Sequence, residues 1–291
     1  TEALVQRGDN VIILTRGKKA SSNKNIEYAQ WNPQAQTIDA AAVQAADYVV
    51  HLAGANVRQG RWTESRKKEI VDSRVQSGQL LVKALAESEN KIKAVISMSA
   101  IGWYGSDAQV PNPKPFVESD GPDNSFLAAT CQQWEQSISP VAQLNKRLVI
   151  YRAGIVLSDQ GGAYKEFKRP VQLGVASILG SGLQVVSWIH IDDMMRMILF
   201  ALDNESITGV YNAVAPNPVD NKTLVTEIGR QKGFHIPVPV PAFALKIALG
   251  EMSIEVLKSA TVSSQKIETA GFSFQYPTID KAVQQLMKKA S

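Results

Sequence analysis

The chain has 291 residues, of which 44% are hydrophobic, so it is long enough for one large core or one core with a small appendage. It contains no uninterrupted apolar run of about 18 residues, so no membrane span is expected. Its one cysteine, Cys131, excludes an internal disulfide framework and indicates a reducing compartment, which favours a cytoplasmic location. The net charge of +4 comes from 31 basic and 27 acidic residues that are mostly interleaved, so no nucleic-acid partner is expected.

The first residues predict the end of a helix at residues 1–7, a glycine that ends it at Gly8, and a buried strand at residues 11–14. Further apolar strands are expected in chain order at residues 26–31, 47–54, 93–100, 146–154 and 209–216. Because these strands are apolar throughout and helical patterns separate them, they predict a sheet buried on both faces. The expected fold class is therefore a doubly wound, parallel α/β sheet of the Rossmann type.

The clearest helix is expected at residues 63–87, where the apolar stripe consists of Val71, Val75, Gly78, Val82 and Leu85. From about residue 217 the sequence becomes punctuated by proline and then helical. We therefore expect a nucleotide-binding domain at residues 1–216 and a mostly helical cap at residues 217–291 that carries the substrate-side surface.

The early helix end at Gly8 implies that a strand and a turn come before it. In the strand order 3-2-1-4-5-6 the first strand lies in the middle of the sheet, and the glycine-rich turn after it holds the phosphates of a dinucleotide. No G-x-G-x-x-G or G-x-x-G-x-x-G run precedes a helix in this chain. We therefore expect the strand and its turn to lie in about 15–20 residues upstream of Thr1. Residues 1–291 alone would then lack the phosphate cradle, and their cofactor site would be empty.

The end of the second strand carries information about the cofactor. Thr15 and Arg16 lie there, and no acidic residue follows until Glu27. An acidic residue at this point accepts the ribose hydroxyl of NAD, whereas arginine accommodates the 2′-phosphate of NADP. The alternative is that Arg16 only solvates the end of a strand. Within the expected strand order, the pattern favours NADP(H).

Several motifs resemble the extended short-chain dehydrogenases/reductases: HLAG at residues 51–54, SAIGWYG at 99–105 and WIHIDDM at 188–194. Together with RAGIVLS at 152–158, GVYNAVAPNPV at 209–219 and the segment at 250–277, they are similar to a narrower group. This group is the YfcH-like epimerase family of atypical extended members, with its C-terminal domain of unknown function. The resemblance covers essentially the whole chain.

The resemblance implies NADP(H) binding and a small-molecule substrate, and it carries over to individual positions. Thr15 and Arg16 would take the 2′-phosphate end of the cofactor, while Leu52 and Ala53 would lie along the adenosine. Val156 would pack near the nicotinamide.

Two further cofactor contacts are implied on the helix at residues 63–87, namely Glu69 and Arg74. At 100° per residue, Arg74 lies about 60° from the centre of the apolar stripe, where a flanking cation can reach inward. Glu69 falls nearly opposite that centre, so a straight helix would place it in solvent. The helical geometry therefore supports Arg74, whereas Glu69 rests on the resemblance alone.

The superfamily usually transfers a proton through a Tyr-x-x-x-Lys pair beside a serine or threonine at the end of the fifth strand. Ser99 lies where that serine belongs, but the pair aligns with Phe126 and Thr130, which supply neither an exchangeable phenol nor a cation. Tyr104, in the loop after the strand, is the best substitute. Ser99 and Tyr104 are therefore the catalytic candidates. The alternative is that Tyr104 packs the loop or anchors substrate.

His190, next to Asp192 and Asp193, suggests a proton relay or a metal site. The group lies at a strand-to-helix junction, where Asp192 suits the N-cap and Asp193 suits the positive end of the helix dipole. Two adjacent acids and one histidine also fall short of a metal-ligand set. We therefore expect a structural role and no metal. We likewise expect Cys131 to be a small buried residue and not a nucleophile.

Residues 161–170 supply a group of cations near the expected mouth of the pocket: Lys165, Lys168 and Arg169. They could meet an anionic substrate such as a nucleotide-sugar diphosphate, or belong to a solvated loop. Two functional classes stay open. One is an NADP(H)-dependent oxidoreductase or epimerase acting on a carbonyl compound or nucleotide sugar. The other is an inactive NADP(H)-binding sensor or scaffold. The sequence does not predict the oligomeric state.

Overall fold

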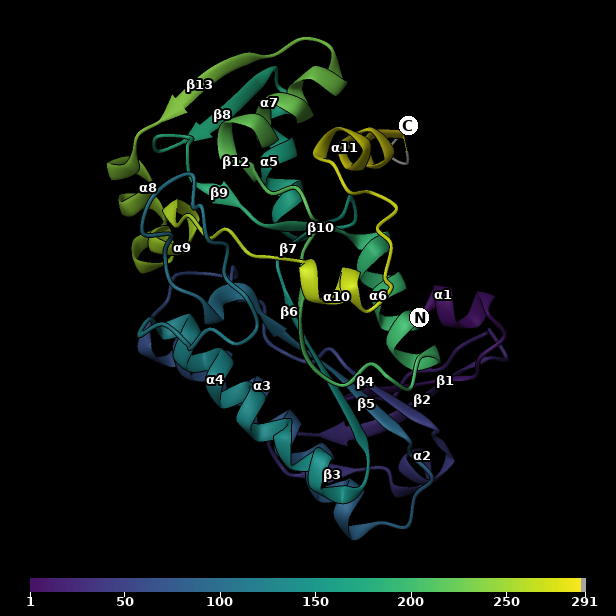
Figure 1. The fold of residues 1–291 in the computed structure, drawn as a ribbon. Coiled ribbons are helices and arrows are strands. Elements are labelled where there is room, and N and C mark those ends of the chain that lie inside the picture. Colours follow the sequence, from purple (N-terminus) through teal and green to yellow (C-terminus); the bar gives the residue numbers. More distant parts are fainter. Residues whose placement is uncertain (289–291) are drawn as a thin grey trace.

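A computed structural model describes residues 1–288 of the chain. Its centre is a parallel sheet in the order β11-β6-β5-β4, shown in Figure 1. These strands are β4 (Tyr48–His51), β5 (Ala94–Ala100), β6 (Arg147–Ala153) and β11 (Gly209–Ala213). All three neighbouring pairs are parallel, so the expected doubly wound α/β class is confirmed.

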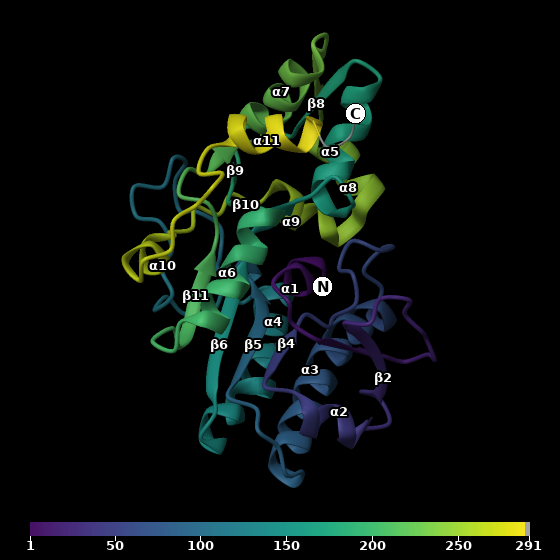
Figure 2. The same cartoon turned by 90° about the vertical axis from the view of Figure 1, so that its right-hand side faces the viewer.

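The two faces of this sheet are covered by different helices. Val95, Leu148 and Ile150 pack against α3 (Glu64–Glu87), while Ala94, Ile96, Val149 and Tyr151 pack against α6 (Ile191–Asp203). Alternate residues of one strand thus belong to two separate cores, which explains why the strands are apolar throughout. Figure 2 shows α3 and α4 (Phe126–Ile138) on one side of the strands and α6 on the other.

The first strands form a second group, in the order β1-β2-β3. This group comprises β1 (Val11–Thr15), β2 (Ile26–Asn32) and β3 (Thr37–Ile38), with β1 and β2 parallel. It is preceded by α1 (Glu2–Gln6), after which Gly8 takes a φ of 95°, as expected of a glycine that ends a helix. The short α2 (Ala40–Ala45) leads into β4. Among the described residues, no ladder joins β1 to β4.

Helix α3 begins where it was expected, because the hydroxyl of Thr63 accepts a hydrogen bond from the amide of Arg66 at 3.2 Å. The expected apolar stripe is partly wrong. Gly78 and Leu85 are buried, but Val71, Val75 and Val82 lie only on the half-buried flank. The buried side also includes Ile70, Ser77, Leu80, Leu81 and Ala84, and its C-terminal half packs on β5, β6 and the segment around Ile138 and Val141.

After β6 the chain leaves the sheet and builds a separate lobe. This part contains β7 (Ile155–Leu157), α5 (Gly162–Gln172), β8 (Val175–Leu179), β9 (Val185–Val186) and β10 (Trp188–His190). It pairs with β12 (Val219–Asp220) and β13 (Ile236–Val240), and α5 packs on α7 (Asn221–Lys232). The lobe therefore draws on residues before 217 and contains strands as well as helices.

The C-terminal segment continues through α8 (Ala242–Leu249), α9 (Ser253–Leu257), α10 (Gln265–Thr269) and α11 (Ile279–Lys288). The carboxylate of Asp107 ties this segment to the loop after β5, because it accepts hydrogen bonds from both hydroxyls of Ser259 and Thr261 at 2.8 Å. Of the helices described, none has the length and apolar character that a bilayer crossing requires.

Candidate functional site

The carboxyl ends of β4, β5 and β6 meet at one edge of the parallel sheet, where open α/β proteins bind their ligands. Ser99 is the second-last residue of β5, and Leu52 and Ala53 follow β4 directly. Leu52 is 59% exposed although it is apolar, and Ala53 is half-buried. The structure thus brings these three predicted site residues to the same edge.

Thr15 and Arg16 lie at the end of β1. Thr15 is the last residue of the strand and is half-buried, whereas Arg16 is exposed. Within residues 1–288, Arg16 makes no ion pair with a carboxylate. Lys18 and Lys19 follow after Gly17 and are also exposed, so this strand end carries three cations. Such a strand end can receive a phosphate group.

Arg74 reaches inward from α3, as its place on the helix predicted. Its Nη1 donates to the carbonyl of Ala55 at 3.0 Å and to that of Ile70 at 2.9 Å. Burial lowers the pKa of Arg74 from its ordinary value. A Cβ on Gly54 would lie only 3.1 Å from the Arg74 guanidinium carbon. The glycine of the HLAG motif therefore lets this loop pass close over the arginine.

Glu69 and Val156 do not join this group. The side chain of Glu69 is 60% exposed and pairs with Arg66 at 2.5 Å, on the solvent side of α3. Val156 is half-buried in β7, where it pairs with Ile189 of β10 and packs against the main core. Arg74 lies under the loop after β4. Glu69 lies on the solvent side of α3, as the helical geometry predicted.

Ser99 belongs to a buried charged network that the sequence does not predict. Its hydroxyl donates to the Glu135 carboxylate at 2.7 Å. Arg152 donates twice to the same carboxylate, through Nε at 2.8 Å and through Nη2 at 3.0 Å. The Arg152 guanidinium also lies 3.7 Å from the centre of the Trp103 ring. Since the only proton of Ser99 is already donated to Glu135, its hydroxyl is left free to act as an acceptor.

Tyr104 is fully buried at the other end of this network. Its hydroxyl donates to Asn212 Oδ1 at 2.7 Å and accepts from Arg152 Nη1 at 3.1 Å, while its ring stacks on Phe116. Burial raises the pKa of Tyr104 to about 12, although the hydrogen bond from Arg152 acts in the opposite direction. The ring of Tyr104 thus packs the loop after β5, as in the first part of the alternative that it packs the loop or anchors substrate.

The two positions aligned with the superfamily's dyad lie at the start of α4. Phe126 is half-buried and packs edge-on against Trp62, with Lys67 Nζ 5.4 Å from the centre of its ring. Thr130 is buried, and its hydroxyl donates to the Phe126 carbonyl at 2.8 Å. Lys67 is held by Glu251 of the C-terminal segment at 2.6 Å.

The remaining histidine and cysteine candidates lie inside the protein. His51 lies between the hydroxyls of Ser97 and Ser77, at 3.0 Å and 2.9 Å, and burial lowers its pKa to about 4. Cys131 is buried, as predicted, and burial raises the pKa of its thiol to about 11. A thiol in this state is a poor nucleophile at neutral pH.

The WIHIDD junction has the expected structural character, with one correction. The N-cap of α6 is His190, whose Nδ1 accepts from the amide of Asp192 at 3.0 Å, so the expectation that Asp192 caps the helix was wrong. His190 directly precedes the helix, so its ring nitrogen accepts the hydrogen bond from this first-turn amide, and Asp192 lies within the first turn instead. Asp193 is buried in the first turn and accepts the amides of Gln275 and Tyr276, each at 2.8 Å.

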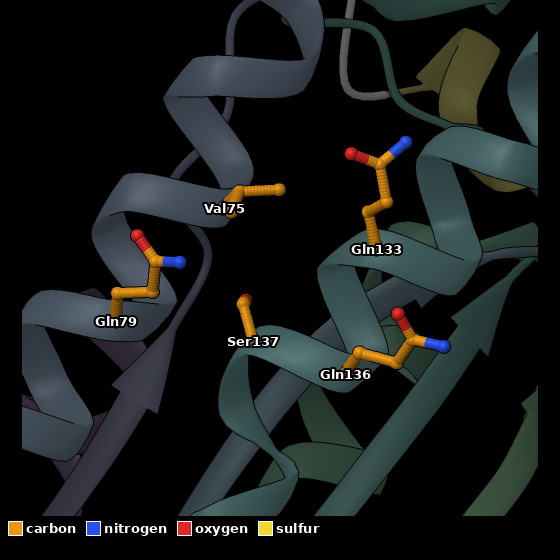
Figure 3. Close-up of a pocket in the computed structure, with 5 residues that line it drawn as sticks. All are labelled: Val75, Gln79, Gln133, Gln136 and Ser137. Atoms are coloured by element: carbon orange, nitrogen blue, oxygen red, sulfur yellow. The ribbon is translucent and has the colours of Figure 1, made fainter.

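The cations expected near the pocket mouth lie on a helix and not in a loop. Lys165, Lys168 and Arg169 belong to α5, where Arg169 pairs with Glu166 at 3.2 Å. No cluster of three or more metal-ligating side chains occurs among the described residues. A small hollow of about 210 Å³ between α3 and α4 is lined by uncharged residues, shown in Figure 3: Val75, Gln79, Gln133, Gln136 and Ser137. It carries no group suited to acid–base chemistry.

A larger cavity, of about 980 Å³, lies between β1 and β4 and is hereafter the β1–β4 cavity. Residues of both strands line it, from Val11 to Leu14 and from Tyr48 to His51, and it extends to Leu52 and Ala53 at the carboxyl edge. The cavity therefore separates the two groups of strands and extends to the carboxyl edge, where the expected cofactor contacts Leu52 and Ala53 lie.

The parallel strand order, with helices on both faces of the sheet, defines an α/β protein of the Rossmann type. The chain belongs to the NAD-dependent epimerase/dehydratase family, whose model matches residues 1–213. A second model, a domain of unknown function called DUF1731, matches residues 240–286.

Relatives and solved structures agree with this assignment. The chain is 34% identical to the epimerase family protein YfhF of Bacillus subtilis, over 99% of this chain and 93% of that protein. It is 35% identical to the epimerase family protein SAR0825 of Staphylococcus aureus, over 98% and 93%. The structure of human epimerase family protein SDR39U1 with NADPH has a TM-score of 0.87 and 25% identity, covering 99% of this chain and 94% of that one. A UDP-glucuronic acid 4-epimerase from Bacillus cereus, at 17% identity and a TM-score of 0.78, shares the fold.

Proposed function

We propose that this protein binds NADP(H) at the carboxyl edge of its sheet and acts as an oxidoreductase or nucleotide-sugar-type epimerase of the extended short-chain dehydrogenase/reductase type. The observation that carries the proposal is Arg16, an exposed cation without an ion-pair partner among the described residues, at the end of β1. The NADPH in the SDR39U1 structure supports the same cofactor.

The residues present fit such a cofactor. Arg16 would hold the 2′-phosphate beside Thr15, the exposed Leu52 and neighbouring Ala53 would lie along the adenosine, and Arg74 would face the cofactor from below the loop after β4. When bound, the nicotinamide would supply or accept hydride. The finer family proposal is the YfcH-like group of atypical extended members.

The proposal also gives each part of the chain a role. We propose residues 1–216 as the cofactor-binding domain and residues 217–291 as the cap, with β8 and α5 of the first part packed into the cap. The substrate would be a small molecule bound between them, such as a carbonyl compound or a nucleotide sugar. Glu69 and Val156 enter the proposal as outer contacts only, because Glu69 faces solvent and Val156 lies in β7.

The catalytic roles of Ser99 and Tyr104 are proposed as orienting roles. Ser99 can accept a hydrogen bond from substrate because Glu135 takes its proton, and Tyr104 holds Arg152 in place. The pair Phe126 and Thr130 supports no proton transfer of the Tyr-x-x-x-Lys kind. A cytoplasmic location is proposed on the single buried cysteine.

The second candidate is a catalytically inactive NADP(H)-binding sensor or scaffold. It is favoured by Phe126 at the dyad position and by the complete burial of Tyr104. The two are separated by measuring NADPH oxidation by the full-length protein over a panel of carbonyl compounds and nucleotide sugars. Turnover that falls in Ser99→Ala supports the enzyme. NADPH binding without any turnover supports the sensor, and turnover that survives both Ser99→Ala and Tyr104→Phe would contradict the proposed roles.

A further inference from the structure

A lysine–glutamate pair joins the two halves of the molecule beside the carboxyl edge of the sheet. Lys67 belongs to the first turn of α3, and Glu251 follows α8 in the C-terminal segment. We propose that the Lys67 ammonium is the acid that gives a proton to the oxygen of a carbonyl substrate, and that Glu251 positions this ammonium. The inference rests on the proposed function, because it assumes a redox reaction at this edge.

The contacts of Lys67 define the pair. Its Nζ lies 2.6 Å from a carboxylate oxygen of Glu251 and 3.5 Å from one of Glu64. The same Nζ lies 5.4 Å from the centre of the Phe126 ring, at the start of α4 where the dyad of the superfamily aligns. Lys67 therefore brings a cation to the part of the molecule where Thr130 supplies none.

The loop after β4 holds this pair next to the edge of the sheet. It begins with Leu52, directly after β4, and leads into α3. Arg61 of this loop donates to the carbonyl of Ile247 on α8 at 2.6 Å, and Trp62 packs edge-on against the ring of Phe126. The pair thus lies between the cofactor-binding half and the C-terminal segment. Ligand sites form preferentially at such junctions, and at the carboxyl edge of a parallel sheet.

Both members of the pair are accessible to solvent. The side chain of Lys67 is 20% exposed and that of Glu251 is 39% exposed. The hydrogen bond to Glu251 is the main cause that raises the pKa of Lys67 above its ordinary value, so the ammonium is fully protonated at neutral pH. Such an ammonium can donate a hydrogen bond to a substrate oxygen and release its proton when that oxygen becomes negative.

Other proton-bearing groups near this edge are already occupied or buried. Tyr104 is fully buried, and its hydroxyl donates to Asn212. The proton of Ser99 is donated to Glu135, and Cys131 is buried. Of these four side chains that can carry a proton, only Lys67 is both protonated and accessible, so it is the best-placed acid.

The proposed step balances with the hydride that the cofactor supplies. As the carbonyl carbon of the substrate receives the hydride, its oxygen takes the proton from Lys67 Nζ, so new C–H and O–H bonds replace the second bond between carbon and oxygen. The carbonyl compound is reduced to an alcohol, and NADP⁺ is the oxidised product. The neutral amine of Lys67 then takes a proton from water, and the carboxylate of Glu251 holds the restored ammonium in the same place.

Substitutions of Lys67 test the acid in the full-length protein, with benzaldehyde and cyclohexanone as the probe carbonyl compounds. Lys67→Met should lower kcat by about 100- to 10,000-fold, while the Kd for NADPH stays within about threefold of the wild type. Lys67→Arg keeps the charge but should not restore kcat, because a guanidinium does not release its proton at neutral pH. Glu64→Gln is the matched control: Glu64 also contacts Lys67, but its side chain is 93% exposed, and kcat should not change.

The positioning role of Glu251 predicts a different pattern. Glu251→Gln should lower kcat by about tenfold and leave the KM for the probe compound nearly unchanged, because it displaces the acid without removing a contact to substrate. A rise in KM at constant kcat would show that Glu251 binds substrate, and would overturn its positioning role.

Nuclear magnetic resonance of lysine side chains that carry carbon-13 methyl groups gives a readout independent of turnover. The Lys67 signal, assigned by its loss in Lys67→Arg, should move when NADP⁺ binds, because a charged nicotinamide ring would lie near it. The signal of Lys68, which is exposed and pairs with Asp72 on the same helix, should stay in place.

The outcomes separate this inference from the proposed function. Turnover that survives Lys67→Met, or a Lys67 signal that stays in place in protein that binds NADP⁺, would overturn the inference alone. If the wild type turns over neither probe compound, the Lys67 signal decides the inference. Protein that binds neither NADPH nor NADP⁺ would overturn the proposed function, on which the inference rests.

Discussion

Arg152 and Glu135 form a buried, two-bond ion pair at the carboxyl edge of the sheet, with N–O distances of 2.8 and 3.0 Å. The Arg152 side chain is 3% exposed, and the pair links Ser99 on one side to Tyr104 on the other. A buried charge costs free energy unless an opposite charge and hydrogen bonds compensate it. The hydrogen bonds of this pair to Ser99 and Tyr104 therefore hold both candidate residues in one geometry.

Removing one partner of this pair should destabilise the protein strongly. Glu135→Ala leaves the Arg152 guanidinium buried and unpaired, so the free energy of unfolding should fall by about 3–5 kcal/mol in urea denaturation. The matched control is Glu166→Ala, which breaks the solvent-accessible pairs with Arg169 and Arg58 and should cost no more than about 1 kcal/mol. Equal, small losses in the two variants would show that the buried network does not hold the fold.

Tyr104 should remain protonated far above neutral pH. Burial raises its pKa to about 12, so the difference in ultraviolet absorbance between the wild type and Tyr104→Phe should show no phenolate from Tyr104 between about pH 6 and pH 10. Such a phenol cannot act as a base at neutral pH in the ligand-free protein. A Tyr104 phenolate signal below pH 9 would contradict this and restore a proton-transfer role.

The stability of the protein should depend on His51 in acid. Its pKa falls to about 4 in the folded protein from about 6.5 in the unfolded chain, so the unfolded chain binds more protons between these values. This contribution is fully present above pH 6.5 and is lost as the pH falls toward 4, at most about 3 kcal/mol. Nuclear magnetic resonance of the imidazole measures the folded pKa, and a value near 6.5 would contradict the burial argument.

Cys131 should resist thiol reagents in the folded protein. Burial raises its pKa to about 11, and its Sγ lies 3.6 Å from the Ala100 carbonyl. Labelling with a disulfide reagent at pH 8 should therefore follow unfolding and become rapid only in denaturant. Rapid stoichiometric labelling of the native protein would show that Cys131 is reachable and reactive.

The sequence predicted the layers of the fold because burial on both faces leaves a direct mark on a strand. The strands at 94–100 and 147–153 were found within one residue at each end, and Thr63 marked the start of α3. The stripe on α3 was less accurate, because the buried side of that helix packs on the sheet and on the end of α4, while Val75 lies beside the hollow between α3 and α4.

Site residues could be predicted only where the position of a single residue within its own strand or helix is informative. Arg16 follows a strand end, and Arg74 flanks a helical stripe, so both could be placed from sequence spacing. Glu135 and Arg152 were missed because their pairing joins a helix to a strand. The available signals were a cation inside the apolar run Leu-Val-Ile-Tyr-Arg-Ala and an acid on the buried side of α4. Neither signal identifies its partner.

The most direct test of the account is the affinity of the full-length protein for NADPH and NADH, with and without Arg16. Wild-type protein should bind NADPH more tightly than NADH, and Arg16→Ala should weaken NADPH binding by about 10- to 100-fold while leaving NADH binding nearly unchanged, because a charge-assisted phosphate contact is worth about 1.5–3 kcal/mol. Lys114→Ala, at an exposed lysine in the loop after β5, is the control. Equal affinities for NADPH and NADH that Arg16→Ala does not alter would contradict the account.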